Sequence, residues 1–506
     1  MSSGSVPDGS WRALFLSAAN HQRWFVAGLL VFFFLLSIQY SYKAVAGRSA
    51  FLRWRTQIEH LDDVDIYQRF KYPNPPIMAL LLEWLVRLPP VVGSLTWFYL
   101  KVAMTLLAFY WVFRLVPGLG PPFPPWAKIV TILLSLRPIM GDLYHNNVNI
   151  FILFLLVGSL FAFSRGRHAT SGVILALAIA CKVTPALFIP YFLWKRAWRA
   201  LAGCAVGLVL FLLIVPGLFL GMDRNLGLLS SWEKQMIEPF VVNGVVASEH
   251  NNQSLPGLAY RLLTHSPSSS KFDYALWKYT PQEYSNWLAL TPKTVQWFLK
   301  VCMAAFVLLV IWSCRTKVAS GQWPAAREEK PAPYLLATSH WQLATTNWPL
   351  AAEFSLIVLG MLLFSERTWK HHCVTLVLPC AVILYYLAVE RPNLTLRWFL
   401  IGILSSVTLL MASTSINGLS TWWDKGAKLA QVHGAYVWAY LLLILALVVL
   451  LRRGSIQSSA EVIGLRLRFS GLIPRSVFEF PEREPINPTE SRTDFIPLST
   501  QRNPPA

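Results

Sequence analysis

The stretch that decides the fold reads SYKAVAGRSAFLRWRTQIEHLDDVDIYQRFKYPNPP and spans residues 41–76. It follows the first apolar run and holds six Lys/Arg and four Asp/Glu residues. Lys and Arg are normally scarce in short loops on the far side of a membrane. The topology below puts this loop on that side, so its basic residues suggest an anionic substrate at the membrane surface, and its carboxylates suggest a general base. The alternative is a solvated loop whose charges pair with each other.

The composition places the chain among helical membrane proteins. Hydrophobic residues make up 55% of the 506 residues and charged residues only 14%, and the mean hydropathy is +0.46. Apolar runs of about 20 residues recur, which is the length that a helix needs to cross a bilayer. The net charge of +19 fits Lys/Arg-rich cytoplasmic loops beside anionic lipid. The sequence shows no basic and aromatic patch on a soluble domain, so it does not indicate nucleic acid as a partner.

The six cysteines fall in or at the ends of apolar runs. We therefore expect small buried side chains and no disulfide framework. No Cys/His spacing typical of a metal site occurs in the sequence, so we expect no metal.

The order of apolar and polar runs predicts an all-α, polytopic membrane protein with about twelve membrane segments and both ends inside. We expect a cytoplasmic N-terminus over residues 1–23, a transmembrane domain over residues 24–451 and a disordered cytoplasmic tail over residues 452–506. The two long outer loops are residues 41–76 and 222–293. The second loop has six basic and six acidic residues, and we expect it to fold onto the membrane surface.

The apolar segment over residues 171–194 has two interpretations, either one span or two short helices. Basic residues flank it on both sides, at 165–167 and at 195–199. Because both flanks should be cytoplasmic, we predict two short helices that enter and return, with Lys182 and Pro185 at the turn. An ionisable residue inside an apolar hairpin is functional by default, although a lysine can also snorkel to the interface.

Polar groups from distant parts of the chain gather on the outer side in this topology. They are residues 41–76, 142–147, the turn at Lys182, residues 222–293 and residues 366–372. Their convergence on one face is what a binding or catalytic site needs.

Five short motifs occur in an order that resembles the GT-C class of integral-membrane glycosyltransferases and, within it, glycosyltransferase family 87, also known as DUF2029. This family includes polyprenol-phosphate-mannose-dependent mannosyltransferases. The motifs are Ile66-Tyr67 followed by FKYPNPP at 70–76, Asn146-Asn147-Val148-Asn149, ACKVTP at 180–185 before Trp194-Lys195-Arg196, Asn252-Gln253-Ser254-Leu255 with Arg261-Leu262, and SERTWKHH at 365–372. The resemblance implies a GT-C-like helical fold whose extracytoplasmic loops form the site.

The resemblance also implies the activity of an inverting hexosyltransferase. Such an enzyme moves a sugar, which is mannose in one branch of the family, from a polyprenyl-phosphate donor to a membrane lipid or glycan acceptor. The resemblance places this reaction on the outer face of the plasma membrane. The donor is a co-substrate, and this chemistry requires no cofactor or metal. One general base suffices, and fixed cations must stabilise the leaving phosphate. Two rivals stay open, a transporter or flippase for a lipid-linked sugar and a catalytically inactive member that binds a lipid phosphate.

One departure from the family concerns the general base. Members commonly carry an Asp before an aromatic residue at the start of the first outer loop, and in the mannosyltransferase branch this Asp is the base. The corresponding residues 48–51 here read RSAF, with no acid. We expect a helix over residues 58–66 that puts Asp62 and Asp65 on one face. The candidate catalytic residues are therefore Asp65, then Asp62, then Asp63.

Other candidate site residues follow from their chemistry and from the motifs. The candidate cations for the donor phosphate are Lys182, Arg53, Arg55, Arg261, His371 and His372. The candidates for sugar or acceptor binding are Tyr72, Asn147, Asn252, Gln253 and Trp369. The reserve carboxylates are Glu366 and Asp142. As alternatives, the two His residues form an ordinary interfacial pair, the two amides tie down their own loop, and the aromatic residues populate the membrane interface.

Overall fold

The computed structural model describes residues 28, 31–43, 45–46, 49–273, 278–314, 346–415 and 421–469. The expectations for residues 1–23, for nearly all of the loop at 315–347 and for residues 470–506 fall outside these ranges. The chain divides into two units, Met1–Arg452 and Arg453–Ala506. The site and almost all of the described elements belong to the first unit.

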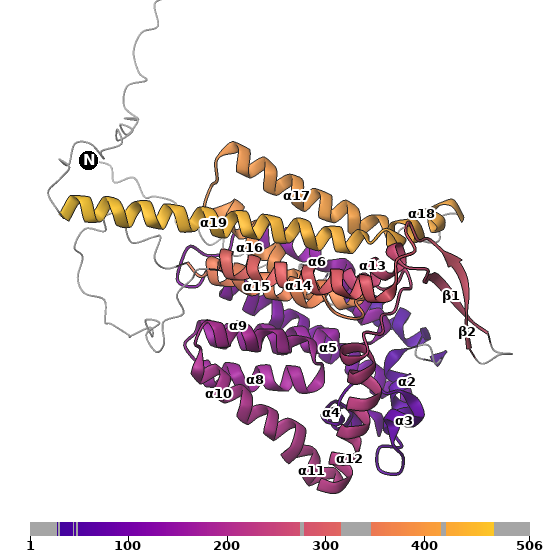
Figure 1. Ribbon diagram of the computed structural model, residues 1–506. Helices are drawn as coiled ribbons and strands as arrows, with labels where there is room; N and C mark the ends of the chain where they lie inside the picture. The colour runs from indigo at the N-terminus through magenta and orange to yellow at the C-terminus, as the bar shows by residue number, and fades with distance from the viewer. Residues whose placement is uncertain are drawn as a thin grey trace, which may run out of the picture. The chain divides into compact units, whose positions relative to one another are not determined.

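Helices build nearly all of the described chain (Figure 1). After helical residues 31–43, the first part contains α2 (Ala50–Ile58), α3 (Ile66–Phe70), α4 (Pro76–Val86), α5 (Pro90–Leu115), α6 (Pro125–His145), α7 (Asn149–Ser164), α8 (His168–Cys181), η1 (Thr184–Leu187) and α9 (Phe188–Trp194). The middle part contains α10 (Trp198–Val209), η2 (Leu210–Ile214), α11 (Val215–Leu220), α12 (Met222–Trp232), η3 (Glu233–Val242), α13 (Leu255–Leu263), β1 (Pro267–Asp273) and β2 (Lys278–Tyr284). The last part contains α14 (Pro292–Ser313), α15 (Trp348–Leu363), η5 (Lys370–Leu376), α16 (Val377–Val389), α17 (Leu394–Ser413), α18 (Thr421–Val432) and α19 (Ala435–Phe469).

Local sequence signals begin many of these helices. Proline occupies the first helical turn where its missing N–H costs nothing, at Pro76, Pro90, Pro125 and Pro292. Short polar side chains accept a hydrogen bond from a first-turn N–H, at Ser49, Asp65, Ser254, Thr291 and Asn393.

Six helical stretches in the described residues are long and apolar enough to cross a membrane. They are Pro90–Leu115, Trp198–Leu220, Pro292–Ser313, Lys370–Val389, Leu394–Ser413 and Ala435–Arg453. Shorter apolar helices, such as α4, α7, α8 and α15, accompany them. The chain is therefore a multi-pass, mostly helical membrane protein, and the number of twelve segments stays a prediction.

The predicted hairpin around Lys182 is confirmed by the packing of α8 against α10. A Cβ added at Gly172 would lie 2.0 Å from the carbonyl oxygen of Ala200, and one at Gly203 would lie 2.2 Å from that of Ala169. The starts of α8 and α10 therefore lie side by side, and the two helices run in the same direction. Because α10 starts beside the start of α8, the chain must return between them. The return runs through η1 and α9, so both basic flanks lie at the same end.

The expected helix over residues 58–66 does not form, which corrects the sequence prediction. Helix α2 ends at Ile58, and a separate short helix, α3, begins at Ile66. The Asp65 carboxylate accepts hydrogen bonds from the N–H groups of Tyr67 (2.9 Å) and Gln68 (3.1 Å). An Asp side chain that bonds the backbone in this way starts a new helix rather than continuing an old one.

Two further differences from the predicted fold concern the 222–293 loop and the chain after residue 451. The loop is folded, as predicted, but it contains the antiparallel pair β1–β2, so the described chain is not purely α-helical. Helix α19 continues to Phe469, beyond the predicted start of the tail, since no proline interrupts residues 454–469.

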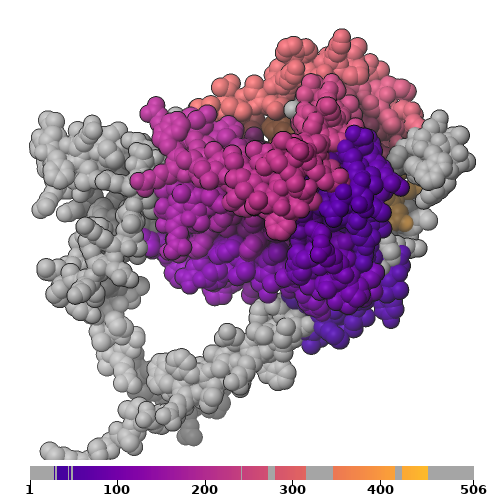
Figure 2. Space-filling view, turned by 90° about the horizontal axis from the view of Figure 1, so that it is seen from below, coloured from indigo at the N-terminus to yellow at the C-terminus, as the bar shows by residue number. Residues whose placement is uncertain are grey.

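The first outer loop forms a small helical layer with its own apolar core. Phe51, Trp54, Ile66 and Tyr67 are buried there together with Val148 at the start of α7. Figure 2 shows the indigo N-terminal elements in contact with the magenta middle of the chain, and α3 packs against α12 and η3 in this region. This layer positions α2 beside the end of α6.

Candidate functional site

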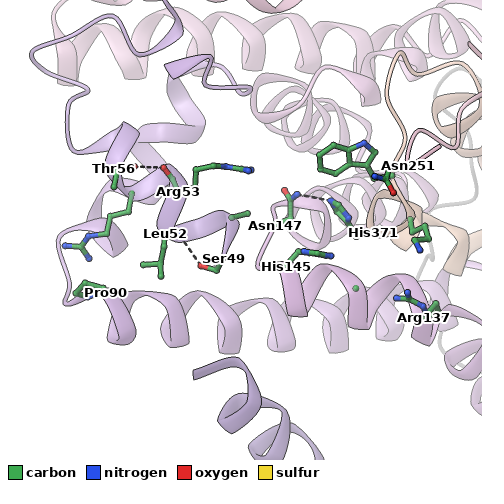
Figure 3. A pocket seen from close by; sticks show the side chains of 15 residues that line it. Ser49, Leu52, Arg53, Thr56, Pro90, Arg137, His145, Asn147, Asn251 and His371 are labelled. Atoms are coloured by element: carbon green, nitrogen blue, oxygen red, sulfur yellow. Dashed lines mark hydrogen bonds between the residues drawn. The ribbon is translucent and has the colours of Figure 1, made fainter. Parts of the chain in front are cut away.

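A cavity of about 930 Å³ opens between the first outer loop and the ends of the central helices (Figure 3). One wall is α2 with the start of α5, a second is the end of α6 with the turn that follows it, and a third is the start of η5. The lining residues are Ser49, Ala50, Leu52, Arg53, Arg55, Thr56, Pro90, Arg137, Gly141, His145, Asn147, Asn251, Trp369, Lys370 and His371. Five of the predicted site residues are among them, namely Arg53, Arg55, Asn147, Trp369 and His371.

The charged groups of this lining are all basic. Four cationic side chains, Arg53, Arg55, Arg137 and Lys370, line the cavity, and no Asp or Glu is among its described lining residues. A cleft with low-dielectric walls and charges of one sign attracts ligands of the opposite sign. The cavity is therefore suited to an anion such as a phosphate.

The two arginines of α2 differ in their freedom to bind a ligand. Arg55 pairs with Glu59 through Nε at 2.8 Å and donates from Nη1 to the carbonyl oxygen of Leu88 at 2.5 Å. Arg53 is exposed, and no hydrogen bond of its guanidinium occurs in the described part of the chain. In Figure 3 its side chain extends towards Asn147. Arg53 is thus the more available cation of the two.

Arg137 and Lys370 line the cavity but were not among the predicted residues. Arg137 donates from Nε to the hydroxyl of Ser415 at 2.7 Å, and Lys370 donates to the carbonyl oxygen of Thr414 at 2.9 Å. The end of α17 therefore holds both cations in place. A signal for Arg137 existed, because it is an ionisable residue inside the apolar run of α6, which is functional by default in a membrane protein.

Two histidines and an amide form the floor of the cavity. Asn147 and His371 are joined by a hydrogen bond of 3.0 Å between Nδ2 and Nε2. The Asn147 carbonyl accepts from the N–H of Val148 at 2.8 Å, which fixes the orientation of the amide. The amide nitrogen is therefore the donor, and Nε2 of His371 is the acceptor. His145 packs against His371 with ring centroids 5.0 Å apart.

Lys182 lies behind this floor rather than in the large cavity. It lines a small cavity of about 30 Å³ together with Asn149, Thr368 and His372. Its ammonium group donates to Oδ1 of Asn149 at 2.6 Å. His372 and His371 stand edge to face with centroids 4.8 Å apart, so the His pair separates the two cavities.

A buried ion pair lies next to Lys182 and engages one of the reserve carboxylates. Lys101 and Asp142 are both fully buried, with Nζ and Oδ2 3.3 Å apart. Asp142 also accepts from Nδ2 of Asn149 at 2.9 Å and from the N–H of Ile150 at 3.4 Å. These hydrogen bonds satisfy the carboxylate within the protein, which favours a structural role for Asp142.

The other reserve carboxylate, Glu366, lies near Lys182. Its Oε2 is buried and has no hydrogen-bond partner among the described residues. Burial raises the pKa of Glu366, while the nearby charges of Arg367 and Lys182 lower it in part. Glu366 is not among the residues that line the large cavity.

The amides of Asn252 and Gln253 bind their own protein rather than point into the cavity. Both are buried. Asn252 donates to the carbonyl oxygens of Ala247 and Glu366 and accepts from the N–H of Thr368 at 2.9 Å. Gln253 donates to the carbonyl oxygens of His250 and Gln431 and accepts from the N–H of Tyr436. The structure therefore follows the alternative interpretation, in which these amides tie down a loop, and it is Asn251 that lines the cavity.

Arg261 is not brought to the cavity either. Its side chain is fully buried in α13, and its guanidinium donates only to backbone carbonyl oxygens. These belong to Val432, Ser248, Glu249, Asn252 and Gln431. Burial lowers the pKa of Arg261 to about 10, which still leaves it charged at neutral pH. The hydrogen bonds of this guanidinium therefore link the loop before α13 to the end of α18.

The predicted catalytic aspartates and Tyr72 also lie apart from the lining of the cavity. Asp62 and Asp63 are exposed in the turn after α2, and Asp65 caps α3. Tyr72 is fully buried in the core of the first outer loop. Ser49, at the start of α2, does line the cavity, and its hydroxyl accepts from the N–H of Leu52 at 3.2 Å.

No group of three or more His, Cys, Asp or Glu side chains that could hold a metal occurs within the described ranges. The cysteines within those ranges are free thiols, and most of them are buried.

Comparison with known proteins gives one match. No curated protein and no solved structure matches the chain. The model described as Glycosyltransferase family 87 matches residues 72–328, slightly more than half of the 506 residues. The matched range contains the motifs at 146–149, 180–185 and 252–255, and it ends before the motif at 365–372. The protein therefore belongs to glycosyltransferase family 87, and it is a membrane-embedded glycosyltransferase.

Proposed function

We propose that this glycosyltransferase moves a hexosyl group from a polyprenyl-phosphate sugar to a lipid or glycan acceptor, with inversion at the anomeric carbon. The observation that carries the proposal is the cavity with four cationic side chains and no acidic residue in its described lining. A lipid phosphate gains negative charge as its bond to the sugar breaks, and fixed cations stabilise that charge. Mannose is the sugar that the family resemblance suggests.

The donor phosphate binds, in this proposal, beside Arg53 and Arg55 on α2, with Arg137 and Lys370 on the opposite wall. The free guanidinium of Arg53 supports this assignment. Lys182 and His372 lie one layer deeper, behind the ring of His371. The positive charge of Lys182 supports the same anion from behind the floor, because electrostatic interactions are strong at sites that exclude water.

The sugar and the acceptor occupy the rest of the cavity. Trp369 offers an aromatic face, and the amides of Asn147 and Asn251 offer groups that bind hydroxyls. Tyr72, Asn252 and Gln253, which the sequence also suggested, act in this proposal by holding the surrounding loops.

The cavity faces the extracytoplasmic side of the plasma membrane in this proposal. The basic residues at 165–167 and 195–199 lie at the end of α7 and α9 that is remote from Asn149 and Lys182. By the positive-inside rule, that end is cytoplasmic. A helix of the length of α7 separates the two ends by roughly 24 Å.

Transfer of labelled sugar tests the proposal. Membranes that contain the protein are incubated with polyprenyl phosphates carrying radiolabelled mannose, glucose or arabinose, and label in lipid and glycan acceptors is measured. Arg53→Met should raise the donor KM about tenfold or more, because it removes a charged hydrogen bond worth about 1.5–3 kcal/mol. Arg69→Met, an exposed arginine of the same loop outside the cavity, is the matched control and should change nothing.

A second pair of variants tests the deeper layer. Lys182→Met should abolish transfer, whereas Lys300→Met on the exposed face of α14 should not. The two rival functions give different results. Movement of the donor across the bilayer without transfer would indicate a flippase, and donor binding without either would indicate an inactive lipid-phosphate-binding protein.

A further inference from the structure

No Asp or Glu is among the described lining residues, so the cavity has no carboxylate there to act as the general base. The stretch 48–51, which corresponds to the start of the loop where family members commonly carry an Asp, has no acid, and the hydroxyl of Ser49 caps α2. Among the described lining residues the ionisable groups are three arginines, one lysine and two histidines. The arginines have no free lone pair, and the ammonium group of Lys370 is held by the carbonyl oxygen of Thr414, so the two imidazoles are the best placed to accept a proton.

The two histidines differ in their access to a substrate. His371 is buried, with 7% of its surface exposed, and the lone pair on its Nε2 is taken by the amide of Asn147. His145 is exposed, and within the described ranges no hydrogen bond engages its ring. In the view of Figure 3 the His145 side chain lies between those of Ser49 and Arg137. A free imidazole therefore lines the same cavity as Ser49 at the start of α2.

The position of His145 is fixed by the fold. It is the last residue of α6, and the next residue, Asn146, has a left-handed backbone with φ of 54°. The buried side chain of Asn146 donates to the carbonyl oxygen of Ser94 at 3.2 Å, which ties the end of α6 to α5. The ring of His371 packs on the other side of His145. A base must be held in this way to reach its proton in a defined geometry.

From this geometry we infer that His145 is the general base of the proposed transfer and replaces the missing carboxylate. The inference rests on the proposed function. The imidazole nitrogen takes the proton of the acceptor hydroxyl as the acceptor oxygen bonds to the anomeric carbon. The bond between that carbon and the donor phosphate oxygen breaks, and its electron pair leaves with the lipid phosphate. The imidazolium then returns its proton to water.

The surroundings of the His145 ring lower its pKa. Part of the residue is exposed to the cavity, but burial of the rest is the main cause and lowers the pKa to about 4, and the charges of Lys43, Arg137 and Lys101 act in the same direction. Asp142 opposes them, and His371 faces the ring from η5. The ring is therefore neutral at pH 7, with a lone pair free to accept a proton. A bound donor phosphate adds negative charge and raises the pKa of the ring.

The decisive experiment restores the carboxylate at a different residue. His145→Gln keeps a hydrogen-bonding side chain of similar size but removes the base, and it should lower kcat by about 10²–10⁴-fold with the donor KM nearly unchanged. Adding Ser49→Asp to His145→Gln should recover a large part of kcat, because Asp also caps helices and places a carboxylate in the lining of the same cavity. His265→Gln, whose ring packs on Tyr284 outside the cavity, is the control and should be fully active.

Other outcomes overturn the inference. Wild-type kcat in His145→Gln would exclude His145 as the base and leave the proposed function standing. A loss of kcat in Asp65→Asn, Asp62→Asn or Asp63→Asn, with His145→Gln active, would return the base to the first outer loop. A loss in His145→Gln that Ser49→Asp does not repair would indicate a positioning role. No transfer by the wild-type protein with any lipid-phosphate sugar would overturn both proposals.

Discussion

Arg53 and Arg261 show how the same side chain serves opposite purposes in this protein. Arg53 is exposed in the cavity, and its guanidinium is available to bind a ligand. Arg261 is buried, and its guanidinium donates hydrogen bonds to carbonyl oxygens of its own chain. Both were predicted to bind the donor phosphate. An isolated arginine in a motif has the same chemistry in either situation, and only its neighbours decide between ligand binding and structural support.

Arg261 is expected to control stability rather than donor affinity. Arg261→Met should lower the free energy of unfolding by at least about 3 kcal/mol, because each buried carbonyl oxygen that loses its donor costs about 1–3 kcal/mol. Thermal unfolding of the purified protein in detergent measures the change, with Arg69→Met as the exposed control. The folded fraction should keep the wild-type donor KM, and a raised KM at unchanged stability would assign Arg261 to the substrate instead.

Close packing of α8 on α10 fixes the hairpin that carries Lys182. Gly172 and Gly203 let the two backbones approach so closely that an added Cβ at either would lie within 2.2 Å of a backbone carbonyl oxygen. Small residues commonly allow such contacts between membrane helices. The turn at Lys182 follows α8 directly, so the position of the ammonium group depends on this contact.

Gly172→Ala should therefore destabilise the protein by about 1–3 kcal/mol, since overpacking shifts the backbone. It should also reduce transfer, because α8 moves and carries Lys182 away from Asn149. Gly402→Ala in α17, where an added Cβ has no neighbour within 4 Å, is the matched control and should be neutral or slightly stabilising. Unfolding temperature and transfer rate are the two measurements. Equal behaviour of the two variants would contradict the role assigned to the α8–α10 contact.

At the scale of the whole molecule, hydrogen bonds join distant segments at the end of the helices that carries the cavity. Lys43 donates to the carbonyl oxygen of Tyr144 at 3.0 Å, and Arg224 donates to the carbonyl oxygens of Leu61 and Val64. Segments far apart in the sequence are thus held together at the end of the helices that carries the cavity. The opposite end carries the basic residues at 165–167.

Labelling from outside the cell tests this orientation. We expect a membrane-impermeant maleimide to label Asp63→Cys and Gln282→Cys, both exposed on the cavity side, in intact cells. Arg167→Cys, exposed at the opposite end, should react only after the membrane is opened. The buried native cysteines give a low background. Labelling of Arg167→Cys in intact cells would reverse the topology and place the cavity in the cytoplasm.

The sequence alone determined the class of the protein, its hairpin and its family. The effects of apolar runs, basic flanks and prolines depend on a single segment or on the membrane around it. They can therefore be predicted from the sequence without a tertiary structure. The two basic flanks of residues 171–194 predicted the return of the chain, and the close approach of Gly172 to Ala200 agrees. The five motifs indicated family 87, which the match over residues 72–328 confirms.

Only the tertiary structure decided which polar residues share the cavity. The sequence prediction did not select Arg137, Lys370 and His145 as site residues, yet the packing of α6 on η5 brings them to the same cavity. Conversely, three residues that matched a motif use their side chains for hydrogen bonds within the protein, namely Asn252, Gln253 and Arg261. The physical reason is that the hydrogen-bonding groups of a side chain are the same whether it binds a ligand or a carbonyl oxygen. Burial and neighbours, which depend on contacts between distant segments, determine which of the two occurs.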